Sequence, residues 1–212
     1  MACILQNGDT ILFQGDSITD FGRGAPPGLG TGYVAMVRGL ITAIRPDLDV
    51  DIVNRGVSGD RTAELLARWD ADCLALRPHV LSIMIGVNDV WRKAGEWNGQ
   101  KHIPLPEYRA NLAKLVESAL GMGSIRHLFL MSPTSITLVN KSGLNDLVGE
   151  YAETVKEFAK TYGAVYVPSH ETTMAARLAL PEVEWSGDGC HPAPAGHALL
   201  AAAWLRAAGV IA

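Results

Sequence analysis

Short apolar runs alternate along this chain with longer segments in which apolar residues recur every three or four positions. Several of the short runs, such as Val80–Ile85, are apolar throughout, which is typical of strands covered on both faces. The runs predict five strands: Thr10–Gln14, Val50–Val53, Val80–Ile85, His127–Met131 and Ala164–Val167.

The longer segments have the period of an amphipathic helix. They predict helices over Tyr33–Ile44, Arg61–Leu76, Leu105–Leu120, Leu144–Tyr162, Glu171–Leu180 and Pro194–Ala207. The Gly- and Pro-rich segments Gly22–Gly32 and Gly95–Pro106 are predicted as loops. Because strands that alternate with helices form right-handed crossovers, we predict a single α/β domain over residues 1–212. Its architecture is a three-layer α/β/α sandwich around a five-stranded parallel sheet.

Composition narrows the possible functions. The formal net charge of −4 offers no basic surface for nucleic acid, and no apolar run is long enough to cross a membrane. The three cysteines are odd in number and widely spaced, which favours reduced thiols and a cytoplasmic location. The first ten residues have no signal-peptide pattern.

Glycine and polar residues follow four of the predicted elements. In an open parallel sheet, ligands bind beyond the carboxyl ends of the strands, so these segments should meet at one edge. The segments are Gly15-Asp16-Ser17, Ser58-Gly59-Asp60, Gly86-Val87-Asn88-Asp89 and Asp188-Gly189-Cys190-His191.

These segments contain the residue types that acyl transfer needs. Ser17 is the candidate nucleophile, and His191 is the candidate base because histidine accepts a proton near neutral pH. Asp188, three residues before His191, is placed to orient its ring. The backbone N–H groups of Ser17 and Gly59 and the side-chain amide of Asn88 are candidate donors to the developing oxyanion.

With these four motifs in this order, the chain resembles the SGNH (GDSL-type) hydrolase family, from residue 11 to about residue 197. The resemblance implies a flavodoxin-like sheet, ester hydrolysis without metal or cofactor, and the oxyanion roles given above. Three further segments are similar to bacterial intracellular acetylxylan esterases: Gly30–Ala35, Ala67–Trp69 and Ser82–Arg92. That similarity implies a small acetylated oligosaccharide as substrate and makes a homo-oligomer plausible.

Trp91 and Trp185 flank two of the motifs, and an aromatic wall suits stacking on a sugar ring, so both are candidate substrate contacts. Packing within the protein is the more common role for such tryptophans. The apolar, alanine-rich helix Pro194–Ala207 leaves room for contacts between subunits.

Other interpretations remain at this point. Ser17 alone is equally suited to cap a helix, and Cys190, His191 and His197 lack the spacing of standard zinc sites. Within the same family, a broad-specificity arylesterase, thioesterase or lysophospholipase is an alternative. A non-catalytic glycan-binding protein retaining the fold is another. A flavin- or nucleotide-binding protein would need a phosphate-binding loop that the sequence lacks.

Overall fold

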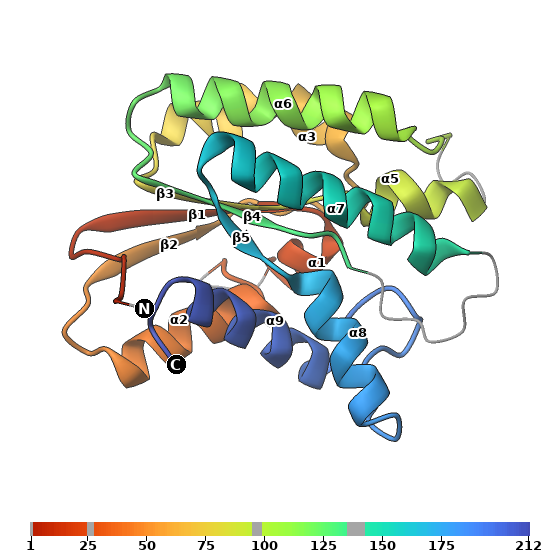
Figure 1. The fold of residues 1–212 in the computed structure, drawn as a ribbon. Coiled ribbons are helices and arrows are strands. Elements are labelled where there is room, and N and C mark those ends of the chain that lie inside the picture. Colours follow the sequence, from red (N-terminus) through yellow and green to blue (C-terminus); the bar gives the residue numbers. More distant parts are fainter. Residues whose placement is uncertain (1, 25–27, 95–98, 135–142) are drawn as a thin grey trace.

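A five-stranded parallel sheet runs through the centre of the protein (Figure 1). The computed structural model describes residues 2–24, 28–94, 99–134 and 143–212. The strands follow the order β2-β1-β3-β4-β5, and every neighbouring pair is parallel. Their bounds are β1 Asp9–Gly15, β2 Val50–Asn54, β3 Val80–Met84, β4 His127–Met131 and β5 Val165–Val167. The predicted sheet is confirmed.

Helices cover both faces of this sheet, as Figure 1 shows. One face carries α1 (Ser17–Asp20), α2 (Tyr33–Ile44), α8 (Ser169–Ala179) and α9 (Pro194–Ala207). The other carries α3 (Thr62–Ala67), α6 (Leu105–Gly121) and α7 (Leu144–Tyr162). The short elements α4 (Trp69–Asp72) and η1 (Leu74–Leu76) follow α3 in the chain, and α5 (Val87–Trp91) and η2 (Arg92–Ala94) follow β3. The three-layer α/β/α sandwich is therefore confirmed.

Successive strand residues point to opposite sides of the sheet and form two apolar cores. In β1, Ile11 and Phe13 pack toward α2 and α9, whereas Leu12 packs toward α3 and α6. The indole of Trp204 in α9 lies against Phe13 and Phe129, with ring centroids 5.2 and 4.8 Å apart. Full burial of one such side chain stabilises the fold by roughly 1.5–3 kcal/mol. The two cores hold the carboxyl edge of the sheet as a rigid base for loops.

The predicted helix Arg61–Leu76 is wrong in one respect, because it is broken into α3, α4 and η1. The first break lies at Arg68 and the second at Cys73, and the backbone of each leaves the helical region. The Arg68 guanidinium donates to the Asp60 carboxylate at 2.7 Å and to the Gly15 carbonyl at 3.2 Å. These side-chain hydrogen bonds tie the segment to the end of β1 and to the loop before α3.

The apolar side chains of helix α9 pack into the core between this helix, α2 and the sheet. Leu200, Trp204 and Leu205 are at most 2% exposed. The apolar composition of this segment therefore gives no support to a subunit contact, and the homo-oligomer stays a prediction. None of the described helices is long and apolar enough to span a membrane.

The two predicted loops are described only in part, since residues 25–27 and 95–98 lie outside the described ranges. The second prediction extends too far, because Leu105 and Pro106 already form the first turn of α6. Proline is well suited to that position, where its missing N–H costs no helical hydrogen bond.

Candidate active site

Ser17 lies at the turn from β1 into the short helix α1, at the carboxyl edge of the sheet. A side chain at Gly15 would collide with the Met84 carbonyl and with Thr19, so only glycine allows this tight exit from the strand. Asp16, not Ser17, caps α1, because its Oδ1 accepts from the Ile18 N–H at 3.0 Å. The interpretation of Ser17 as the capping residue is wrong, and its hydroxyl is directed into the site.

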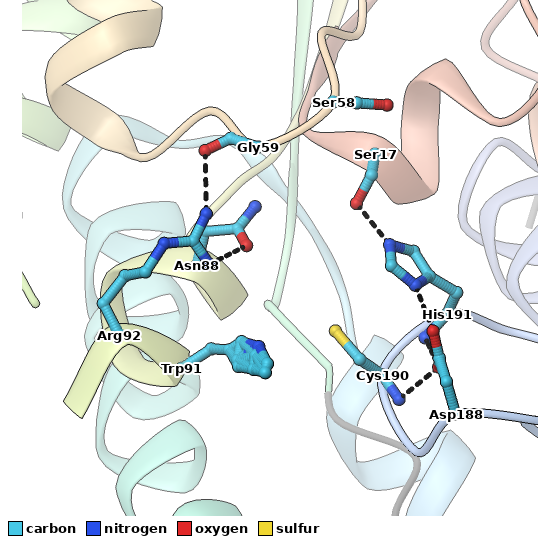
Figure 2. A pocket seen from close by; sticks show the side chains of 9 residues that line it. All are labelled: Ser17, Ser58, Gly59, Asn88, Trp91, Arg92, Asp188, Cys190 and His191. Carbon is cyan, nitrogen blue, oxygen red and sulfur yellow. Dashed lines mark hydrogen bonds and ion pairs between the residues drawn. The ribbon is translucent and has the colours of Figure 1, made fainter. Parts of the chain in front are cut away.

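Three of the predicted residues form one chain of hydrogen bonds (Figure 2). Ser17 Oγ lies 2.8 Å from His191 Nε2, and His191 Nδ1 lies 2.6 Å from Asp188 Oδ2. Ser17 and His191 are 174 positions apart in sequence, so only the fold brings them together. In this arrangement Nδ1 carries the proton shared with Asp188, which leaves Nε2 to accept the serine proton.

The loop that carries Asp188 and His191 is held by its own backbone. Asp188 Oδ1 accepts from the N–H groups of Cys190 and His191 at 2.8 and 2.7 Å. Partial burial acts to raise the pKa of Asp188, but hydrogen bonds from the His191 ring and these two N–H groups outweigh it and lower the pKa to about 2. Asp188 is therefore a carboxylate at any pH near neutrality, as an orienting group must be.

The predicted oxyanion donors lie around the same pocket as Ser17. Gly59 has φ of +87°, a conformation that favours glycine. Asn88 is 5% exposed, and its Nδ2 donates to the Asp60 carbonyl at 3.0 Å. An amide nitrogen has two hydrogens, so the second one is left to face a ligand.

Two buried carboxyl groups support the loops around the site. Asp89 accepts from the N–H and hydroxyl of Thr62 at 3.1 and 2.5 Å and so fastens α5 to the start of α3. Burial raises the pKa of Asp89 to about 7 against the opposing effect of these hydrogen bonds. Burial likewise raises the pKa of Asp16 to about 7, with the nearby Asp89 charge adding to the rise. Both accept hydrogen bonds from backbone N–H groups, Asp16 from Ile18 and Asp89 from Thr62.

The predicted catalytic residues and oxyanion donors border a pocket of about 460 Å³. Trp91 is 37% exposed on one side of it, and Cys190 lies near His191 on the other (Figure 2). Burial raises the pKa of the Cys190 thiol to about 12, so this thiol stays protonated and is a poor nucleophile. The lining residues are Ser17, Ser58, Gly59, Asn88, Trp91, Arg92, Asp188, Cys190 and His191.

Trp185, the second predicted aromatic contact, is not among the residues that line this pocket. It is 8% exposed, and its indole N–H donates to the Leu180 carbonyl at 3.0 Å. Its backbone carbonyl also accepts from the Ala193 N–H, which closes the base of the Asp188–His191 loop. Trp185 therefore packs behind this loop rather than facing the site.

The sequence interpretation did not single out Ser58, Cys190 or Arg92 as site residues, although all three line the pocket. Ser58 comes directly before Gly59, and Cys190 comes directly before His191. Their position next to predicted site residues was the one feature of the sequence that could have indicated them. Arg92 follows Asn88 by four positions, a spacing that places two side chains on one helical face. That signal was missed because no helix was predicted over Val87–Trp91.

The described residues contain no group of three or more His, Cys, Asp or Glu side chains arranged to hold a metal ion. His197 lies 1% exposed in α9 and accepts from the Tyr33 N–H at its Nδ1, 3.1 Å away. Burial lowers the pKa of His197 to about 4. Its role is therefore to join α9 to α2 as a neutral ring.

A parallel α/β/α sandwich with a serine, a histidine and an aspartate at its carboxyl edge defines a class of acyl hydrolases. Comparison with known protein families identifies the family within this class. The model of the GDSL-like Lipase/Acylhydrolase family matches residues 13–199, and the chain belongs to this family. It is a carboxylic ester hydrolase.

Known relatives agree with that assignment. The chain is 38% identical to an acetylxylan esterase of Geobacillus stearothermophilus over 210 residues, 96% of this chain and 95% of that protein. The crystal structure of that esterase, Axe2, matches with a TM-score of 0.89 at 37% identity, over 97% and 96% of the two chains. Three of the Axe2 structures are described as catalytic mutants, in which a serine, an aspartate or a histidine is replaced by alanine.

A more distant relative is named for the acetate ester of another kind of alcohol. The isoamyl acetate-hydrolyzing esterase 1 homolog of Mus musculus is 26% identical over 211 residues, 90% of this chain and 77% of that protein. Both relatives are named for acetate esters, one of a polysaccharide and one of a branched alcohol. They share the acyl group and differ in the alcohol.

Proposed function

We propose that this protein hydrolyses acetyl esters with Ser17 as nucleophile, His191 as general base and Asp188 as the group that orients His191. The observation that carries the proposal is the continuous hydrogen-bond chain from Ser17 Oγ through the imidazole to Asp188. A serine hydroxyl is a weak nucleophile until an adjacent base removes its proton. Here that base is 2.8 Å away, within the reach that proton transfer requires.

The reaction proceeds in two halves. Ser17 Oγ attacks the acetyl carbonyl carbon while its proton passes to His191 Nε2, and the carbonyl oxygen becomes an oxyanion. The intermediate collapses, the alcohol leaves with the proton from His191, and acetyl-Ser17 remains. Water then gives a proton to His191 and attacks this ester, which forms a second oxyanion. As this intermediate collapses, His191 returns the proton to Ser17 Oγ, and acetic acid leaves and ionises to acetate. The N–H groups of Ser17 and Gly59 and the Asn88 amide stabilise both oxyanions.

The substrate is proposed to be a small acetylated oligosaccharide derived from plant polysaccharide, such as an acetylated xylo-oligosaccharide. The acetylxylan esterase relationship supports this substrate over nearly the whole chain. The pocket volume of about 460 Å³ lies toward the lower end of the roughly 300–1,000 Å³ typical of ligand sites. Trp91, a little over a third exposed, offers a flat apolar face on which a sugar ring can stack.

Mass spectrometry of acetylated xylo-oligosaccharides before and after incubation tests this function. Wild-type protein is expected to remove acetyl units and release acetate, and Ser17→Ala is expected to remove none above the rate without enzyme. Acetylated rhamnogalacturonan fragments serve as the comparison substrate. Unchanged xylo-oligosaccharides, or equal deacetylation by Ser17→Ala, would show that the proposal is wrong.

The broad-specificity alternatives differ in acyl chain length. 4-Nitrophenyl esters of acetate, octanoate and palmitate share one leaving group, so their kcat/KM values compare the acyl groups alone. Acetate is expected to be hydrolysed fastest. A wide preference for octanoate or palmitate would instead favour a lysophospholipase or thioesterase.

The cellular setting is proposed to be the cytoplasm, with the chain acting as one domain over residues 1–212. All three cysteines, Cys3, Cys73 and Cys190, are described, and each is a free thiol. Free thiols suit a reducing compartment. The proposed partner is the small-molecule ester alone, with no metal, cofactor or nucleic acid needed for the two-step reaction.

A further inference from the structure

A buried arginine lies directly behind the proposed oxyanion donors. Arg92, at the start of η2, is 6% exposed and borders the pocket (Figure 2). Its guanidinium carbon lies 6.0 Å from the centroid of the Trp91 ring. Placing a guanidinium in this environment costs hydration, and burial accordingly lowers the pKa of Arg92 from that of a solvated arginine. The geometry of its hydrogen bonds indicates what it does there.

The first contact fixes the direction of the Asn88 amide. Arg92 Nη1 donates to Asn88 Oδ1 at 2.9 Å, while Asn88 Nδ2 donates to the Asp60 carbonyl at 3.0 Å. Rotation of the amide by 180° would set an NH₂ group against the guanidinium and turn the carbonyl oxygen toward Asp60. Arg92 therefore keeps the Nδ2 hydrogens on the side where a negative oxygen forms.

The second contact reaches the other loop. Arg92 Nη2 donates to the Gly59 carbonyl at 3.3 Å, and the N–H of the same residue is the second proposed donor. Nη2 also donates to Gln100 Oε1 at 3.2 Å. One planar guanidinium thus contacts the side chain of one oxyanion donor and the backbone of another, which come from α5 and from the loop after β2. Such a forked group fixes relative positions better than a flexible ammonium does.

We infer that Arg92 is a positioning residue of the oxyanion hole. It fixes Asn88 and Gly59 relative to each other and polarises the Asn88 amide toward the tetrahedral intermediate. Its positive charge on Oδ1 strengthens the opposite N–H as a donor, since linked hydrogen bonds reinforce one another. Because the oxyanion carries more negative charge than the ground-state carbonyl, this effect acts on kcat rather than on KM. The inference rests on the proposed function.

Steady-state hydrolysis of 4-nitrophenyl acetate by Arg92→Met tests it. We expect kcat to fall by about 10- to 100-fold with KM changed by less than about threefold, since misplaced donors cost rate in this range. Affinity for methylboronic acid, whose serine adduct places an oxygen among the same donors, should fall in parallel. If Arg92 served only the stability of the fold, its loss would reduce the fraction of active molecules and so the apparent kcat. The affinity of the remaining folded molecules for methylboronic acid would then stay unchanged.

A double-mutant cycle identifies the route of the effect. In the Asn88→Ala background, Arg92→Met should lower kcat by less than about fivefold, because the amide that it orients is gone. Equal losses with and without Asn88, or a rise in KM at unchanged kcat, would overturn the inference. If Arg92→Met does not fold, Arg92→Lys is used in its place, because lysine keeps the positive charge and lacks the forked guanidinium. A wild-type kcat in Arg92→Lys would also overturn the inference.

Arg109→Met is the matched control. Arg109 in α6 likewise donates hydrogen bonds from its guanidinium, to Thr154 and Glu157, and lies 5.5 Å from the Phe158 ring centroid. It is outside the pocket, and its loss should leave kcat unchanged. The Ser17→Ala variant distinguishes a failure of the proposed function from a failure of the inference about Arg92. Wild-type kcat in that variant would defeat the proposed function itself, whereas its inactivity with unaffected Arg92→Met would defeat only the inference.

Discussion

At the scale of single residues, the site depends on a carboxylate that stays ionised although it is partly removed from water. Asp188 accepts hydrogen bonds from the His191 ring, from two backbone N–H groups and from the Ser186 hydroxyl. Those from the ring and the two N–H groups lower its pKa to about 2. It can therefore fix the imidazole tautomer over the whole neutral range. The proposed role requires this loop geometry and not deep burial, since about half of the side chain is exposed.

Asp188→Asn should remove this control with little effect on the fold. The amide can donate where the carboxylate only accepts, so it favours the tautomer in which Nε2 carries the proton and cannot accept one. By analogy with other triads, we expect kcat for 4-nitrophenyl acetate to fall on the order of 10⁴-fold. The thermal unfolding midpoint should stay close to that of the wild type. A loss of less than tenfold would mean that Asp188 does not orient His191.

At the scale of elements, the strands and most helices could be predicted because their signals are local. Apolar runs such as Val80–Ile85 locate strands directly, and α2, α7 and α9 have the predicted bounds. The break at Arg68 could not be predicted from local pattern, and the side-chain hydrogen bond that accompanies it reaches Gly15, 53 residues away in sequence. Helix α5 was missed because Val87–Trp91 is too short to show a helical period.

Asp89 connects α5 to the start of α3 through its hydrogen bonds with Thr62. Because the pKa of Asp89 is raised in the folded protein, its contribution to stability depends on pH. A carboxyl group whose pKa is near 3.8 unfolded and about 7 folded binds more protons in the folded state between these values. Its contribution to stability is fully present below about pH 4 and is lost as the pH rises through about 7. Relative to the wild type, Asp89→Asn should therefore gain in free energy of unfolding across this window, by up to about 1 kcal/mol per pH unit.

Urea denaturation of the two proteins at pH 4.5, 5.5 and 6.5 measures this difference. Asp47→Asn is a useful control because a hydrogen bond from Arg45 lowers the pKa of the exposed Asp47, so any change there has the opposite sign. A constant or falling difference between Asp89→Asn and the wild type across these three pH values would contradict the account.

At the scale of the whole molecule, the sequence was sufficient for the fold class and for the residues that meet at the sheet edge. Alternating strands and helices place the ends of β1, β2 and β3 together, so the convergence of Ser17, Gly59 and Asn88 follows from topology. Which side chains face the pocket and which pack behind it depends on the course of the loops, which local pattern does not encode. Trp185 and Arg92 illustrate the two errors that result, one residue included and one omitted.

Covalent labelling of the intact protein tests the central claim most directly. An alkyl fluorophosphonate reacts with a serine only when a neighbouring base activates it, and mass spectrometry of the peptides locates the adduct. We expect one adduct per chain, on Ser17, absent in Ser17→Ala and formed far more slowly in His191→Ala. A label on Ser58 or Cys190, or undiminished labelling of Ser17 in His191→Ala, would contradict the assignment of Ser17 as a nucleophile activated by His191.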